Sequence, residues 1–115
     1  VGFSIATADE EIRKLFEPGA SPIRERIGAL GVLHAKGIPT FAMIAPLLPG
    51  AGGLVEELAP IVDSVLIDRL NYFYANRIYK EEGMEWALED VFFHGQADQL
   101  AEGFRRKGIP VQVLF

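Results

Sequence analysis

The sequence predicts a parallel α/β fold, and three observations support this prediction. Four short apolar segments alternate with segments that have the residue spacing of amphipathic helices. The apolar segments lack a regular alternation with polar residues, which is typical of strands covered on both faces. The tetrapeptide Lys-Gly-Ile-Pro occurs at residues 36–39 and again at 107–110, and each copy places glycine between a helix and a strand. We therefore expect one domain over residues 1–115, with a parallel sheet of about four strands and covering helices.

The first strand and the first helix are predicted at the start of the chain. Residues 1–7 form an apolar segment with the length of a buried strand. Thr7 and Glu10 then match a capping box, Thr-x-x-Glu, which marks the beginning of a helix. Pro18 follows soon afterwards, and proline cannot continue a helix. We expect a short helix between Thr7 and Pro18.

A second helix and a second strand follow. Ser21 has the side chain of an N-cap, and Pro22 suits the first helical position. Apolar residues recur every three or four positions as far as Leu33, and Gly37 is placed to end this helix. Residues 38–48 form the next strand, which is closed by two prolines and a glycine.

The rest of the chain continues the pattern. We expect helices over residues 54–62 and 96–107, one or two helices over 77–93, and strands over 64–70 and 110–115. His34 is interpreted as a helix-surface or groove residue, and His94 as part of a turn before Gly95. Neither histidine belongs to a spaced metal-binding or catalytic motif.

Composition restricts the classes of function. The formal net charge is −5, which argues against a broad cationic surface for nucleic-acid phosphates but leaves room for a local basic patch. No apolar run reaches the roughly 18 residues that span a membrane, and no charged-then-apolar leader opens the sequence. The absence of cysteine excludes disulfides and thiolate-bound metal in this chain. We expect a cytoplasmic protein. The first residue is Val1 and not Met, which is the pattern expected of a processed or excised fragment.

Candidate ligand-binding residues are placed where parallel strands end, because ligands gather at that edge of such folds. Ser4 is a hydroxyl within an apolar strand, so it must bond either a neighbouring backbone group or a ligand. Thr7 is already explained as a helix cap. Glu17 lies in a turn, where it is either solvated or paired with Arg24 or Arg26; such a pair would fix the shape of the loop.

Two further segments carry polar groups at strand ends. The glycines of residues 50–53 resemble a phosphate cradle, although a plain loop explains them more simply. Asp68 and Arg69 interrupt the third strand and point to opposite faces, so one faces the helices and the other the inner side of the sheet. We expect a structural or pocket-lining network there, which Asn71 and Tyr72 would extend. The aromatic residues 72–74 suit base stacking, a lid or ordinary core packing.

Several of these segments together resemble a known family. They are Phe3-Ser4-Ile5, Glu17-Pro18-Gly19-Ala20-Ser21, Arg26, Ile44-Ala45-Pro46 and the final Val111-Gln112-Val113. In this order they resemble the radical S-adenosylmethionine (SAM) enzymes of the spore photoproduct lyase type, a DNA repair family. The likeness is best over residues 1–50.

The resemblance implies a half of a (β/α)6 partial TIM barrel, with the N-terminal half of the same barrel as partner. It implies SAM binding by Ser4, Thr7, Glu17, Arg26, Ala45 and Pro46. In that family a reduced [4Fe–4S] cluster cleaves SAM, and the resulting radical reverts a thymine lesion in DNA. This chain lacks the three cysteines that hold the cluster. The cluster is therefore expected in the full-length parent only, and the chain alone is expected to be inactive.

Two alternatives remain open from the residues. The first is a flavodoxin-like binding module that holds a phosphorylated ligand at residues 50–53. The second is an assembly module, because a half barrel leaves sheet edges open and would self-associate. A nucleic acid partner is not supported by the charge, and no membrane partner is expected.

Overall fold

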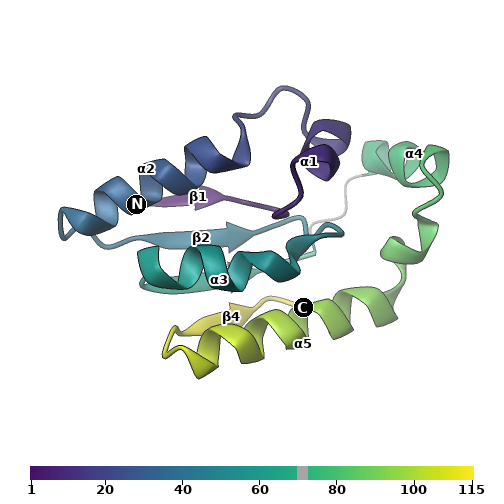
Figure 1. The fold of residues 1–115 in the computed structure, drawn as a ribbon. Helices are drawn as coiled ribbons and strands as arrows, with labels where there is room; N and C mark the ends of the chain where they lie inside the picture. Colours follow the sequence, from purple (N-terminus) through teal and green to yellow (C-terminus); the bar gives the residue numbers. More distant parts are fainter. Residues whose placement is uncertain (70–72) are drawn as a thin grey trace.

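The protein contains one sheet in which all strands run in the same direction. The computed structural model of the chain describes residues 1–69 and 73–115. The strands are β1 (Gly2–Ser4), β2 (Phe41–Ile44), β3 (Ser64–Ile67) and β4 (Val111–Val113), and they lie side by side in that order (Figure 1). The predicted parallel sheet of four strands is confirmed. The hydrogen-bonded strands are shorter than the apolar segments that predicted them, because the chain leaves the ladder while it is still buried.

The helices connect consecutive strands. They are α1 (Glu10–Phe16), α2 (Ile23–Ala35), α3 (Leu54–Leu58), α4 (Phe73–Glu81) and α5 (Asp90–Arg106), with short 3₁₀ turns at Ala51–Gly53, Ala59–Ile61 and Glu85–Leu88. Helices α2, α3 and α5 lie on the same face of the sheet, whereas α1 and α4 lie beyond the carboxyl ends of the strands (Figure 1). An unbroken strand order with helices on one side is the arrangement expected when every crossover is right-handed. None of the described helices is long and apolar enough to cross a membrane.

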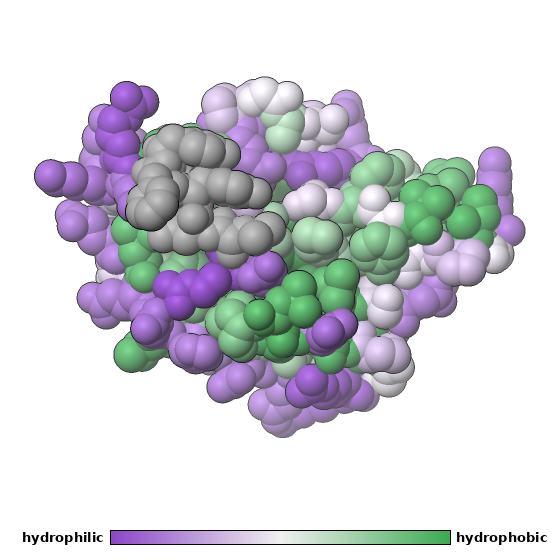
Figure 2. Space-filling view, turned by 180° about the vertical axis from the view of Figure 1, so that it is seen from behind, coloured by the Kyte–Doolittle hydropathy of each residue, from purple (hydrophilic) through white to green (hydrophobic). Residues whose placement is uncertain are grey.

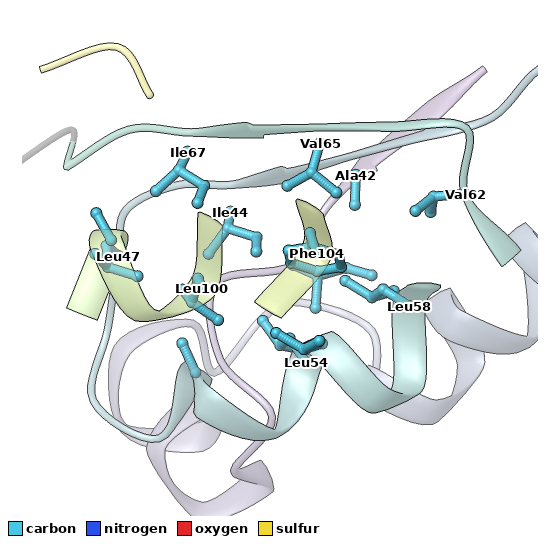
Figure 3. Packing of buried hydrophobic residues seen from close by; sticks show 14 of the residues in the cluster. Ala42, Ile44, Leu47, Leu54, Leu58, Val62, Val65, Ile67, Leu100 and Phe104 are labelled. Carbon is cyan, nitrogen blue, oxygen red and sulfur yellow. The ribbon is translucent and has the colours of Figure 1, made fainter. Parts of the chain in front are cut away.

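The main core fills the space between the sheet and these three helices. Ala42 and Ile44 of β2 point toward the helices together with Val65 and Ile67 of β3 (Figure 3). They meet large side chains from α3 and α5, namely Leu54, Leu58, Leu100 and Phe104, all of which are fully buried. The face of the sheet that carries these residues is therefore the covered face.

None of the described helices covers the opposite face of the sheet. Its residues alternate with those of the core, and the register places Ser4 beside Met43 and Met43 beside Leu66. Met43 and Leu66 are only partly buried and belong to neither hydrophobic core, and the same is true of Phe41. Figure 2 looks at the molecule from this side, where hydrophobic residues (green) lie across the middle of the face. We call it the uncovered face; it comprises Ser4, Phe41, Met43, Ser64, Leu66 and Gln112.

A second, smaller core lies at the carboxyl end of the strands. Ala6 and Leu48, from the loops after β1 and β2, pack with Tyr79 of α4 and with Ala87. The ring of Tyr79 lies 4.6 Å from that of Phe16, centroid to centroid, which joins α4 to α1. This core fixes the loops that carry the candidate site.

The two Lys-Gly-Ile-Pro copies occupy equivalent joints, as predicted. Lys36 and Lys107 are the C-caps of α2 and α5, and Gly37 and Gly108 follow with φ of 79° and 78°. Left-handed backbone of this kind favours glycine, since other residues are strained there. The first joint leads into β2, an inner strand, and the second leads into β4, an edge strand.

Three local predictions are wrong. Asp9, not Thr7, is the N-cap of α1, since its Oδ1 accepts hydrogen bonds from the N–H groups of Glu11 and Ile12 at 2.9 and 3.3 Å. The N-cap position of α2 is Pro22, and no side chain caps this helix. His94 does not lie in a turn, because α5 continues from Asp90 to Arg106 without a break.

Candidate functional site

The candidate site lies where β1, β2 and β3 end. Three chain segments meet there: the loop after Ser4, the loop after Ile44 and the residues after Ile67. The N–H of Ile5 donates to Met43 O at 2.9 Å and the N–H of Asp68 donates to Ile44 O at 3.1 Å, which keeps the three strand ends in register. Polar groups that follow these strands therefore share one edge of the sheet.

Ser4 lies at this edge with its side chain on the uncovered face. Its hydroxyl donates a hydrogen bond to Ala45 O, 2.9 Å away. A neighbouring backbone group therefore bonds the Ser4 hydroxyl, which was one of the two alternatives expected from the sequence. Ser4 is nevertheless exposed, and its oxygen lone pairs can accept a further hydrogen bond. Ala45 is buried and precedes Pro46 through a cis peptide bond.

Arg26 comes to the same edge from the first turns of α2. Its Nη1 donates to Ser4 O at 2.7 Å, and its Nε and Nη2 donate to Ser21 O at 3.2 and 3.0 Å. Glu17 Oε2 lies 3.8 Å from Arg26 Nη1, so Arg26 rather than Arg24 is the partner of Glu17. The structure thus brings together Ser4, Glu17 and Arg26, which the sequence analysis had placed in one site.

Arg13 and Glu10 hold the turn that presents Glu17; the sequence analysis did not name Arg13 and gave Glu10 only a helix-capping role. Arg13 is 6% exposed, and its Nη1 donates to Glu17 O at 3.3 Å and to Ala20 O at 3.0 Å. Glu10 accepts from Arg13 Nε at 2.6 Å and from the N–H of Ile23 at 3.0 Å. The Ile23 hydrogen bond is the main cause that lowers the pKa of Glu10; Arg13 acts in the same direction, and partial desolvation opposes both. The i, i+3 spacing of Glu10 and Arg13 was the available signal.

Thr7 is buried beneath the loops at this edge and is not part of the surface of the candidate site. It is 1% exposed, its hydroxyl donates to Pro49 O at 2.7 Å, and the oxygen accepts from the N–H of Asp9 at 3.1 Å. Gly50 packs against it with φ of 81°, and a Cβ at Gly50 would lie 2.8 Å from Asp9 Cβ. Thr7 therefore joins two loops and presents no free group at the surface.

Packing explains one of the glycines of residues 50–53. Gly50 approaches Asp9 as described, whereas a Cβ at Gly53 would lie at an ordinary contact distance of 3.4 Å from Ala8 Cβ. The 3₁₀ turn Ala51–Gly53 leads into α3, which has only five residues. This favours the simpler interpretation of the segment, a loop.

No family model, curated protein or solved structure matches this chain. The geometry of the site is therefore the basis for what can be proposed about it.

Arg69 ties the end of β3 to α5. Its Nη1 lies 2.5 Å from Asp90 Oδ1, and its guanidinium carbon lies 4.2 Å from the centre of the Phe93 ring. The hydrogen bond from Arg69 lowers the pKa of Asp90. Arg69 thus points toward the helices, as predicted for one member of the Asp68 and Arg69 pair, and it belongs to a structural network. Asn71 and Tyr72, which were expected to extend it, lie outside the described residues.

A second polar cluster lies at the opposite, amino end of the sheet. Thr40 is 2% exposed; its hydroxyl donates to Ile61 O at 2.8 Å, and its N–H donates to Asp63 Oδ2 at 2.8 Å. His34 Nδ1 lies 3.3 Å from Thr40 Oγ1 and 3.9 Å from Asp63 Oδ2. The cluster joins α2 to the entries of β2 and β3. Within the described ranges, no three His, Asp or Glu side chains come close enough together to hold a metal ion.

Proposed function

We propose that residues 1–115 are the SAM-binding C-terminal half of a radical SAM barrel of the spore photoproduct lyase type. The observation that carries the proposal is the topology: four parallel strands in chain order have, among the described residues, their covering helices on one face only. A barrel has this arrangement, because its helices form the outer layer and its other face lines the interior. The uncovered face would then be the interior wall.

The residues at the carboxyl end of this face fit SAM in part. Ser4 is exposed there, its hydroxyl proton is already bonded to Ala45 O, and its oxygen can accept from an ammonium or a ribose hydroxyl. Met43 and Leu66 lie beside it in register and offer apolar contact. Arg26 and Glu17 would act by holding the loop, since the Arg26 guanidinium is bonded to backbone oxygens.

The [4Fe–4S] cluster does not fit this chain. The cluster of such enzymes is held by cysteine thiolates, and the sequence contains none. The cluster and the chemistry it supplies would have to come from the N-terminal half of the barrel. Residues 1–115 would contribute binding and orientation, and lesion repair in DNA is the reaction class that the resemblance favours.

The flavodoxin-like alternative is less well supported. Flavodoxin-like sheets have the strand order 2-1-3-4-5 and bind their ligand where that order reverses. The order here is β1-β2-β3-β4, without a reversal among the described strands. The strand order β1-β2-β3-β4 favours the half-barrel interpretation.

The test is anaerobic incubation of the longer protein that contains residues 1–115 with SAM and a strong reductant. We expect release of 5′-deoxyadenosine, reduced about tenfold or more by Ser4→Ala through loss of a hydrogen bond. Ser64→Ala is the matched control, since Ser64 lies on the same face at the amino end of the sheet. A coding sequence without three clustered cysteines before residue 1 would contradict the proposal.

A further inference from the structure

The edge of the sheet at β1 has backbone groups that point away from the sheet. The N–H of Phe41 donates to Val1 O at 3.0 Å, and the N–H of Ile5 donates to Met43 O at 2.9 Å. In a parallel pair, residues that bond the neighbouring strand alternate with residues whose groups point the other way. The main-chain groups of Gly2 and Ser4 therefore face outward, where a further strand would pair.

The edge at β4 has the same arrangement. The N–H of Val65 donates to Pro110 O at 3.0 Å, and the N–H of Leu114 donates to Ile67 O at 2.9 Å. By the same alternation, the main-chain groups of Val111 and Val113 point away from β3. Both sides of the sheet thus offer outward-facing groups to another parallel strand.

An arginine occupies an outward-facing oxygen at each edge. Arg26 of α2 donates to Ser4 O at 2.7 Å, and Arg105 of α5 donates to Val111 O at 3.1 Å. Each arginine comes from the helix that packs against that edge strand. Unpaired edges invite pairing with another chain, and charged side chains are a common means of preventing it.

We propose that Arg26 and Arg105 guard the two edges of the sheet against pairing with a second copy of this chain. A second copy is the partner because β1 and β4 are three residues long each and parallel, so β4 of one copy can continue the sheet at β1 of another. That contact would leave α2, α3 and α5 of both copies on one side and extend the partly apolar uncovered face. It would also bring Arg26 of one copy near Arg105 of the other, and like charges repel.

The inference goes beyond the proposed function and does not depend on SAM. In a completed barrel, an N–H from the neighbouring strand would replace the guanidinium at Ser4 O. In the chain alone, Arg26 and Arg105 would prevent the open edges from pairing with another copy.

The experiment compares self-association of the double variant Arg26→Met/Arg105→Met with that of the native chain, by sedimentation velocity over a range of concentrations. Methionine keeps the length and apolar contact of the stem but donates no hydrogen bond. We expect association to strengthen about tenfold, as for the loss of one charged hydrogen bond. The matched control is Arg24→Met/Arg106→Met, which makes the same charge change on the same two helices at exposed positions. Equal association of the double variant and the control would overturn the proposal.

Two additions locate the contact and protect the test. Val113→Pro removes an outward-facing N–H from β4 without touching the ladder to β3, so in the double-variant background it should abolish the added association. Association that persists would overturn the proposal, because pairing would then not use this edge. If circular dichroism finds the double variant unfolded, the single variants Arg26→Met and Arg105→Met test the proposal, since each removes the arginine from one side of the contact. Each single variant should then associate more strongly than its own control, Arg24→Met or Arg106→Met, and failure of both would overturn the proposal.

Discussion

Arg26 donates a hydrogen bond of 2.7 Å to the main-chain oxygen of Ser4 and so joins the start of α2 to the carboxyl end of β1. The sequence analysis placed both residues in one site, and the structure joins them through the backbone of Ser4 rather than through its hydroxyl. The Ser4 hydroxyl remains on the uncovered face, where a ligand could reach it. Arg26 is thus a positioning residue in the proposed site.

Arg13 is expected to be important for stability. It is buried and bonds Glu10 and the carbonyl oxygens of Glu17 and Ala20. Arg13→Met should lower the free energy of unfolding by about 2 kcal/mol, because these acceptors lose a charged donor. Lys14→Met is the control and should change the free energy of unfolding by less than about 0.5 kcal/mol. Lys14 is exposed, and its ion pair with Glu11, at 3.6 Å, is screened by solvent. Urea unfolding measures both; equal effects would mean that Arg13 does not hold the turn.

Glu10 should make stability depend on pH. The Ile23 hydrogen bond, and with it Arg13, lowers the pKa of Glu10 from its usual 4.5, despite some desolvation. The folded state therefore binds this proton less tightly than the unfolded chain does. The contribution is complete above the unfolded pKa and is lost as pH falls through the folded pKa. The stability difference between the native chain and Glu10→Gln should shrink below about pH 4.5. A difference that grows toward low pH would contradict the assignment.

Gly50 and Gly37 form a matched pair for substitution. Both have left-handed backbone, with φ of 81° and 79°, but only a Cβ at Gly50 would meet another atom, at 2.8 Å from Asp9 Cβ. Gly37→Ala should cost about 1 kcal/mol of stability from backbone strain alone. Gly50→Ala should cost about 2 kcal/mol or more, because the two loops must also separate. Thermal or urea unfolding of both variants decides this; equal costs would show that the loops yield without penalty.

Tyr79 should titrate apart from an ordinary tyrosine. Its burial where α4 packs against α1 raises its pKa from 10.0 to about 12. Because the folded state favours the neutral phenol, stability should be lost as pH rises above the unfolded value. An ultraviolet titration should contain a step near pH 12 that Tyr79→Phe removes. The prediction fails if all three tyrosines of the chain titrate together near pH 10.

The order of elements could be predicted because it follows from hydrophobicity and glycine. The repeated tetrapeptide located two helix-to-strand joints correctly, since Gly37 and Gly108 both need left-handed backbone. Strand ends could not be predicted from hydrophobicity. Leu47 is completely buried, yet it lies in the loop beyond the end of β2, and a buried loop has the composition of a strand.

The continuous helix α5 was missed because Gly95 follows His94 in its middle. Both residues lie on the exposed side of the helix, where glycine costs only about 1 kcal/mol. Phe93, Ala97, Leu100 and Phe104 lie on the other side and are buried at helical spacing. This packing outweighs the weak local preference for a turn.

The residues of the candidate site were predicted, and two of its contacts, Glu17 with Arg26 and the Ser4 hydroxyl with a backbone group, were among the alternatives. Sequence order placed Ser4, Glu17 and Arg26 near one strand end, and the structure brings them together. The buried Arg13 that holds their turn looked like a surface residue, because it lies among charged neighbours in a short helix. The capping role of Thr7 was wrong because α1 begins at Glu10, so Asp9 precedes its first turn and bonds the N–H groups of Glu11 and Ile12, whereas Thr7 accepts from the N–H of Asp9.

The central claim is that the Ser4 end of the uncovered face binds SAM. The most direct measurement is a titration of the isotope-labelled chain with SAM, followed by NMR, with Ser4→Ala and Ser64→Ala as a matched pair. We predict that SAM shifts the amide signals of Ser4, Met43 and Leu66. Ser4→Ala should weaken the affinity obtained from these shifts about tenfold, and Ser64→Ala should leave it unchanged. The absence of shifts in the native chain, or equal shifts in the native chain and Ser4→Ala, would contradict the claim.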